Sequence, residues 1–384
     1  MKKNYLLSVL FLGCALLLST SWAKAENDQP SNTKGEATQS NTDDLTKQVN
    51  KLLQLLPKFS GYIQTGYNWG DKNGDNRSSF QLKRMRLIMD KKVSERFDVR
   101  AQLELFSGST DGTAFAKKTL TVMDAYVNAH VTKALHFRAG QYYLPLGFEN
   151  YDISPATLET VDFSNICYRM VCRNAVSTPT LIDYGRDLGV MAYGDFLPSK
   201  DNKFNYISYQ LSLTNGYLPT LNDDNKSKDF VGRITVRPIE KLRIIGCYNW
   251  GEYKQLSADR KTVIGNYMPM NRVITGAWYY DPNGLDLRAE YGHIESDDAN
   301  VKEDGFYFLA AYKIGKFLPV ARFDMYRDKA NKTSANNKDN YLIGCTYEPI
   351  KDVKFQVNYI LSDYTDKVDK GTGNSLQIMC LVKF

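Results

Sequence analysis

The fold is decided by Leu120–Asn150, LTVMDAYVNAHVTKALHFRAGQYYLPLGFEN, which predicts two strands, a tight turn and the start of a long loop. Apolar and polar residues alternate along both halves, as they do in a strand with two different faces. One face carries Val127, Ala129, Val131, Leu135, Phe137 and Ala139, and the other carries Asp124, Tyr126, Asn128, His130, His136 and Arg138. The hairpin alone fits either a soluble sandwich or a barrel whose apolar face meets lipid.

Length and composition favour the barrel. A chain of 384 residues usually divides into two or three soluble domains, yet no second composition regime follows the first fifth of this chain. The chain contains 26 Tyr and 18 Phe, while its mean hydropathy is only −0.43. Outer-membrane barrels have such a composition because only every second strand residue contacts lipid.

The amino-terminal segment predicts export. Lys2 and Lys3 precede an apolar run that ends in an A-x-A cleavage site at Ala23 and Ala25, so residues 1–25 are interpreted as a removed signal peptide. The alternative is an uncleaved anchor helix. Removal of Lys2, Lys3 and Lys24 lowers the formal net charge from +6 to +3, which argues against a nucleic-acid partner.

Residues 26–57 predict a periplasmic linker with a short helix. The part from Glu26 to Asn41 is polar and has too little apolar surface to fold alone. Between residues 43 and 57, leucines and a valine recur at helical spacing before Pro57. The helix fits equally well a short coiled coil between subunits and a helix packed on the barrel rim.

From Phe59 onward the period of two predicts an all-β, antiparallel up-and-down transmembrane barrel over residues 58–384. Phe80 and Leu82 are out of phase with Met85 and predict a bulge. The chain ends on Phe384 within a strand, an outward aromatic position typical of outer-membrane barrels. The sixteen candidate strands are five before residue 142 and eleven near 187–194, 204–215, 229–237, 241–251, 271–280, 284–293, 305–313, 318–327, 340–348, 352–361 and 375–384. Short connections alternate with long polar ones, as periplasmic turns alternate with extracellular loops.

Polar positions of these strands carry many arginines, which would face the lumen of a closed barrel. They are Arg84, Arg86, Arg100, Arg138, Arg233, Arg237, Arg243, Arg288 and Arg322. Guanidinium groups in a water-filled path attract anions such as phosphate. We expect an anion pathway lined by Arg84, Arg86, Arg100, Arg138, Arg233 and Arg322. The alternative is that most of them pair with acids on the same face, among them Glu104, Asp124 and Asp324, and keep the wall rigid.

The segment from Leu144 to Arg186 shows no sustained alternation, and an irregular run of this length is usually functional. Folded inward, it would narrow the pore. We expect Tyr143, Tyr168, Arg169 and Arg173 to line this constriction loop. A lid packed over the mouth of the barrel would have the same composition.

Three stretches together resemble the phosphate-selective porin O and P family, in its Bacteroidetes-type branch. They are residues 77–105, residues 124–150 and the closing strand that ends at Phe384, and the likeness runs from Phe59 to Phe384. The resemblance implies a trimeric barrel of sixteen strands in the outer membrane, with an inward loop and a basic lumen that passes phosphate or other anions. It also places the family's motif arginines at Arg84, Arg86 and Arg138. The expected partners are outer-membrane lipid, further copies of the chain and small anionic solutes.

Cysteine and histidine add little chemistry to this interpretation. Cys167 and Cys172, spaced C-x4-C in the loop, fit either a disulfide or two free thiols. Neither a metal site nor a cofactor is predicted, because the three His lack Cys or carboxylate partners at ligand spacing. No nucleophile with a positioned base is evident. We therefore predict an outer-membrane porin that is not an enzyme, and the alternatives are an adhesin or an enzyme built on the same barrel.

Overall fold

The computed structural model describes Val49 and residues 56–72, 74–107, 119–172, 185–216, 225–256, 263–296, 301–330, 332, 336–365 and 371–384. The chain divides into two units, Met1–Leu56 and Pro57–Phe384. The predicted signal peptide, tether and helix therefore fall almost entirely outside the described residues, and they stay predictions. No helix in the described part of the chain is long and apolar enough to cross a membrane.

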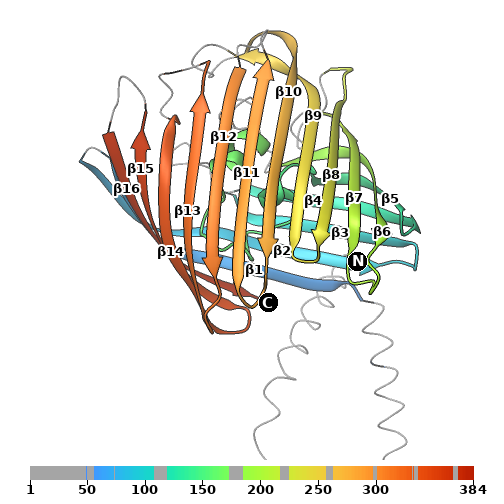
Figure 1. Ribbon diagram of the computed structural model, residues 1–384, viewed down its shortest axis with the longest axis horizontal. Coiled ribbons are helices and arrows are strands. Elements are labelled where there is room, and N and C mark those ends of the chain that lie inside the picture. The colour runs from blue at the N-terminus through green and yellow to red at the C-terminus, as the bar shows by residue number, and fades with distance from the viewer. Residues whose placement is uncertain are drawn as a thin grey trace, which may run out of the picture. The chain divides into compact units, whose positions relative to one another are not determined.

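Sixteen antiparallel strands form a closed barrel in which each strand pairs with its sequence neighbours (Figure 1). The barrel closes where β1 meets β16, and Gly61 and Phe384 exchange backbone hydrogen bonds of 2.8 and 3.0 Å there. The predicted all-β fold and its number of strands are confirmed. The strands are β1 Lys58–Lys72, β2 Asp75–Lys92, β3 Phe97–Ser107, β4 Thr119–Thr132, β5 Leu135–Tyr143, β6 Arg186–Pro198, β7 Asn205–Thr214, β8 Asp229–Ile239, β9 Leu242–Leu256, β10 Val263–Tyr280, β11 Leu285–Ser296, β12 Val301–Tyr312, β13 Phe317–Asp328, β14 Lys338–Ile350, β15 Val353–Tyr364 and β16 Gly371–Lys383.

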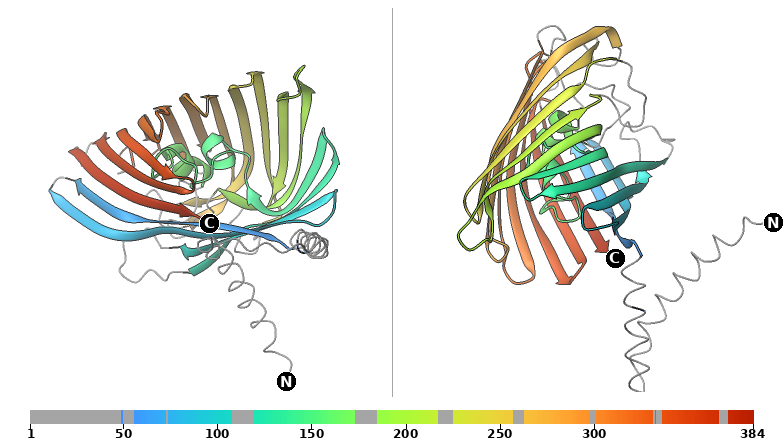
Figure 2. Two further views of the ribbon diagram at one scale, coloured as in Figure 1. Left: turned by 90° about the horizontal axis from the view of Figure 1, so that it is seen from below. Right: turned by 90° about the vertical axis from the view of Figure 1, so that its right-hand side faces the viewer.

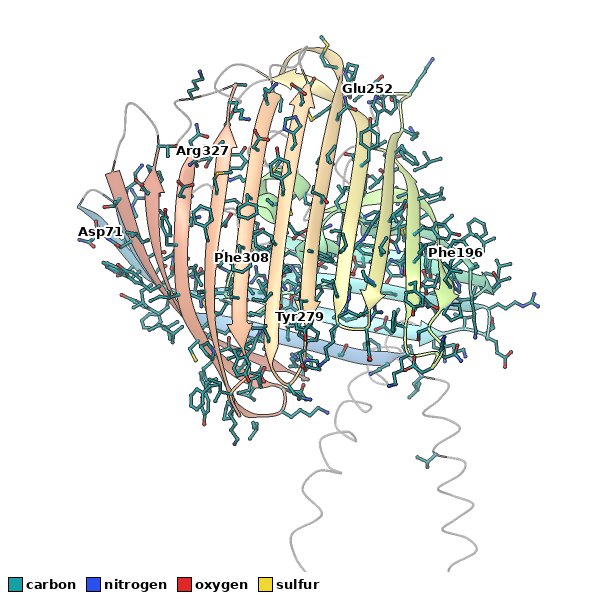
Figure 3. All side chains as sticks on the ribbon, viewed as in Figure 1. Asp71, Phe196, Glu252, Tyr279, Phe308 and Arg327 are labelled. Atoms are coloured by element: carbon teal, nitrogen blue, oxygen red, sulfur yellow. The ribbon has the colours of Figure 1, made fainter. Side chains whose placement is uncertain are left out.

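The two faces of the opening hairpin have the predicted orientation. Val127, Val131 and Phe137 point outward and are 44%, 60% and 46% exposed, whereas Asn128 on the other face is buried. Figure 3 shows the outer side of the barrel, where Phe308 and Tyr279 project from β12 and β10. An apolar outer face suits contact with hydrocarbon, because lipid removes the cost of exposing such side chains to water.

Short turns gather at the end of the barrel where the chain also ends, as Figure 1 shows. Most connections at the opposite end are longer, and the longest runs from β5 to β6. The β1–β2 and β11–β12 connections are exceptions, since both are short although they lie at the long-loop end. The structure also confirms the predicted bulge. Gln64 pairs with Arg84 but Thr65 pairs with Leu82, so Lys83 is the extra residue of β2.

The β5–β6 connection folds into the barrel, where the short helices α3 (Phe148–Tyr151) and η1 (Ile166–Val171) lie inside the ring of strands (Figure 2). We call its described part, residues 144–172, the inward loop. Its apolar side chains pack against lumen-facing residues of β8 to β14, including Val231, Ile274 and Leu309, which are fully buried. The described part of the segment therefore lies inside the barrel and does not form a lid. On these strands the inner face carries apolar residues among its charged ones, because it meets the loop as well as water.

Candidate functional site

Buried ion pairs fix the inward loop to the barrel wall. Arg288 on β11 donates to Glu159, with 2.7 Å between Nη2 and Oε2. Arg233 on β8 donates to Asp152 at 2.5 Å. Burial raises the pKa of Glu159, but the contact with Arg288 outweighs this effect and lowers the pKa overall. Glu159 thus favours its ionised form, and the two loop carboxylates compensate arginines that would otherwise be buried alone.

Asp162 is the loop acid that meets the bulge of β2. Lys83 Nζ lies 2.5 Å from Asp162 Oδ1, and Arg84 Nη2 lies 3.9 Å from the same oxygen. Tyr168 donates to Asp162 at 2.9 Å and accepts a hydrogen bond from Arg84 at 3.0 Å. Burial raises the pKa of Asp162, yet Lys83 and Arg84 more than offset this and hold it well below its usual range. The bulge brings two consecutive cations to the lumen, which a regular strand would place on opposite faces.

Two further arginines bind the loop backbone. Arg322 on β13 donates to the carbonyl of Asp162 at 2.8 Å and lies 3.8 Å from Glu149. Arg272 on β10 donates to the carbonyls of Met170 and Val171. Arg272 is not among the lumen arginines predicted from the sequence, because its face of β10 carries apolar residues, which are not typical of a lumen face. The alternation of side chains along β10, with a period of two, could have identified Arg272 as a lumen residue.

Uncharged groups of β14 and β15 hold the middle of the loop. Gln356 donates to the carbonyl of Leu158 at 3.1 Å, and Asn358 accepts from the backbone amide of Val161 at 2.7 Å. Thr346 donates to the carbonyl of Glu159 at 3.0 Å. An irregular segment buried inside a barrel needs such partners, because its backbone groups cannot bond to each other as in a strand.

On the wall formed by β2 to β6, three arginines pair with carboxylates of the wall. Arg86 Nε donates to Glu104 at 2.8 Å, and both side chains are buried. Arg186 Nε donates to Asp124 at 2.6 Å. Arg100 Nε lies 2.9 Å from Asp90 in a more open pair, where the side chains are 36% and 42% exposed. Pairing across strands, the alternative weighed for these arginines, is therefore present.

Arg138 differs from the other members of the predicted anion pathway. Its Nε donates to the neutral amide of Asn128 at 2.8 Å, and no ion pair joins it to a carboxylate among the described residues. Its guanidinium carbon lies 4.1 Å from the ring centre of Tyr126 and 5.4 Å from that of Tyr193. Asp124, which the sequence allowed as its partner, bonds to Arg186 instead. Arg138 thus presents a positive charge balanced only by dipoles and aromatic rings.

The residues expected at the constriction do not lie together. Tyr168 and Arg169 are in η1 within the inward loop, and both are partly buried. Tyr143 ends β5 on the wall, where the Arg186 guanidinium carbon lies 3.5 Å from its ring centre. Arg173 lies outside the described residues. Tyr143 therefore belongs to the barrel wall, whereas Tyr168 and Arg169 belong to the inward loop.

Cys167 and Cys172 are both buried and both free in the structure. The backbone amide of Cys172 donates to the carbonyl of Cys167 at 2.9 Å at the end of η1. Burial, followed by the neighbouring Cys172, raises the pKa of the Cys167 thiol well above its usual value. Of the two alternatives left by the sequence, the structure has the free thiols.

Residues 59–169, which run from β1 into the inward loop, match the family model described as phosphate-selective porin O and P. The barrel is that of an outer-membrane porin. The family resemblance and the bacterial outer-membrane location predicted from the sequence are thereby confirmed, and porins are channels rather than enzymes. The Bacteroidetes-type branch stays a prediction. An uncharacterized protein of Aquifex aeolicus (strain VF5) is 31% identical over 104 residues, and the match spans 25% of this chain and 25% of that protein.

Solved porins share the fold at low sequence identity. OmpF of Salmonella typhi, solved with daunomycin, has a TM-score of 0.63 and 14% identity, covering 85% of this chain and 97% of that one. An anion-selective porin from Comamonas acidovorans has a TM-score of 0.59 and 14% identity, covering 85% and 99%. OmpT of Vibrio cholerae in a trimer form has a TM-score of 0.55 and 13% identity, covering 85% and 99%. At such identities these matches establish the fold alone.

Proposed function

We propose that this porin is a passive channel for small hydrophilic solutes and prefers anions, with phosphate among the candidates. The proposal rests on which of the lumen arginines have a carboxylate close enough to neutralise their charge. Five of the six arginines of the predicted pathway have a carboxylate within 4 Å, and Arg138 has none in the described part of the chain. An uncompensated cation on a lumen wall attracts anions and repels cations.

The surroundings of Arg138 support an anion contact. Its Nε donates to Asn128, and its two Nη groups carry further N–H donors that suit an oxyanion. The rings of Tyr126, Tyr142 and Tyr193 surround it at 4.1, 6.0 and 5.4 Å. This aromatic cage keeps the charged group from collapsing onto a wall carboxylate. Among the porin matches, the Comamonas acidovorans protein is named as anion-selective.

We assign different roles to the remaining residues of the predicted pathway. Arg84, Arg233 and Arg322 hold the inward loop, and Arg86 stiffens the wall through Glu104. Arg100 is compensated by Asp90 in a half-exposed pair and belongs to the wall. Tyr143, Tyr168, Arg169 and Arg173 shape the constriction.

The assembly is proposed as a homotrimer in outer-membrane lipid, by analogy with porins such as OmpT of Vibrio cholerae, solved in a trimer form. The chain would be processed at residue 25, and residues 26–57 would form the periplasmic linker before the barrel.

Reversal potentials in a planar bilayer test the role of Arg138. Under a potassium chloride gradient, Arg138→Gln should lower the chloride preference of the channel, because it removes the uncompensated charge while keeping a polar side chain with N–H donors. Arg138→Lys is the matched control and should keep the preference, since it retains the charge. Equal reversal potentials for the wild type and Arg138→Gln would remove Arg138 from the anion path.

A further inference from the structure

Two histidines face each other across the β4–β5 hairpin near its turn. His130 and His136 are directly paired in the register of the two strands. Their Nδ1 atoms lie 3.0 Å apart, and the rings meet edge to face with centres 5.0 Å apart. No metal site is predicted here from the sequence, because the histidines lack Cys or carboxylate partners at ligand spacing. The hairpin register supplies a histidine partner instead.

A carboxylate orients the first of these histidines. Asp98 on β3 contacts His130 Nε2 at 2.5 Å, and its other oxygen accepts a hydrogen bond from Asn128 at 2.7 Å. A carboxylate at Nε2 keeps the proton on that nitrogen and directs the lone pair of Nδ1 toward His136. Carboxylates commonly orient metal-binding histidines in this way, with the carboxylate outside the coordination sphere.

The spacing of the two nitrogens suits a shared metal ion. Metal–nitrogen bonds of about 2.0–2.1 Å, at angles between square and tetrahedral, separate two ligand nitrogens by about 2.8–3.4 Å. The observed separation of 3.0 Å lies within this range. The separation therefore fits two imidazole nitrogens bound to one metal ion.

The pair is accessible from solvent. His130 and His136 line a cavity of about 340 Å³ together with Lys133, Asp195 and Asn205. Asp98 and Asp195 supply two negative charges near the pair. Lys133 and Arg138 supply two positive charges, since Arg138 shares Asn128 with Asp98 and the ring of Tyr193 with His136. No cluster of three or more His, Cys, Asp or Glu able to hold a metal occurs in the described part of the chain. Water would therefore complete the coordination.

We propose that His130 and His136 form a two-histidine site for a divalent transition-metal ion on the lumen wall beside the short turns. The expected metals are those that bind imidazole ligands well, such as Ni²⁺, Cu²⁺ or Zn²⁺. Asp98 is a positioning residue for His130. The site depends only on the hairpin and does not depend on which solute the channel passes.

Titration calorimetry of the purified, folded barrel in detergent tests the site, with Ni²⁺ as the probe after removal of adventitious metal by a chelator. The wild type should bind about one Ni²⁺ per chain near pH 7. His130→Ala and His136→Ala should each abolish saturable binding. Asp98→Asn should weaken it by roughly 10- to 100-fold, as the loss of an orienting group does.

His293→Ala is the matched control, because His293 on β11 contacts Asp304 at 2.8 Å and has no second histidine beside it. It should bind Ni²⁺ as the wild type does. Heat-dependent migration on gels shows that each variant is folded. Absence of saturable binding in the wild type would overturn the proposal. Equal binding by the wild type and the His130→Ala/His136→Ala variant, or loss of binding in His293→Ala, would overturn it too.

Discussion

Arg288 Nη2 and Glu159 Oε2 lie 2.7 Å apart, and both side chains are buried between β11 and the inward loop. Glu149 Oε1 lies 3.7 Å from the same Nη2 atom, so two loop acids share one guanidinium of the wall. A pair of this kind is costly to break on one side only, because the remaining charge stays buried. The shared guanidinium therefore fixes the inward loop to β11, because the acids belong to the loop and the arginine belongs to the wall.

Arg288→Met should destabilise the attachment of the loop by about 3–5 kcal/mol, since it leaves Glu159 and Glu149 without this partner. Limited proteolysis should then cut within residues 144–172, and the unfolding temperature of the barrel should fall. Arg100→Met is the control, because its half-exposed pair with Asp90 is worth about 1 kcal/mol or less. A comparable loss of stability in the two variants would contradict the view that the buried loop–wall ion pair matters more than the half-exposed wall pair.

Asp162 should contribute a stability that depends on pH. Its pKa is lower in the folded barrel than in the unfolded chain, because Lys83 and Arg84 face it from β2 while Tyr168 and Gln377 donate to it. The contribution is therefore complete above about pH 4 and is lost as the pH falls further. The gap in unfolding temperature between the wild type and Asp162→Asn should narrow from pH 5 to pH 3. A gap that stays constant would mean that the carboxylate is not held by these cations.

Gly140→Ala should disturb the hairpin that carries Arg138. Gly140 has φ 127°, and a Cβ built there would lie 2.2 Å from the carbonyl oxygen of Ala125 on β4. We expect a loss of roughly 1–3 kcal/mol in thermal or denaturant unfolding, the usual cost of such a backbone conformation. Gly246→Ala is the control, because a Cβ there meets nothing within 4 Å. If both variants unfold like the wild type, the strain at Gly140 is absent.

Cys167 and Cys172 should behave as free, protected thiols. Alkylation of the denatured protein, followed by mass measurement, should give the same number of labelled cysteines with and without prior reductant. Labelling of the folded barrel should leave both residues unmodified, because they are buried and the pKa of Cys167 is raised. Two fewer labels in the unreduced sample would show a disulfide between them.

The barrel itself could be predicted from sequence because its determinants are local. The alternation in Leu120–Asn150, repeated along the chain, gives the strands and the outward face directly. Even the bulge at Lys83 was visible, because Phe80 and Leu82 change phase relative to Met85. A shift of one residue moves every later side chain to the other face, so the hydrophobic pattern records it.

The ion pairs and hydrogen bonds that hold the inward loop could not be predicted, because no local sequence pattern shows which residues will be partners. Glu159 and Arg288 are separated by 129 positions, and Val161 and Asn358 by 197. The rule that apolar residues face lipid also fails at Ile274, which faces the loop inside the barrel. The pairing of His130 with His136 depends on the register of one hairpin, and that register becomes clear only once the turn is placed.

The most direct test is the current through the purified wild-type barrel in a planar bilayer under a potassium chloride gradient. We predict discrete channel openings with a reversal potential displaced toward that of chloride, because Arg138 leaves a positive charge uncompensated in the lumen. Absence of conductance would contradict the channel. A reversal potential displaced toward that of potassium would contradict the anion preference and the role given to Arg138.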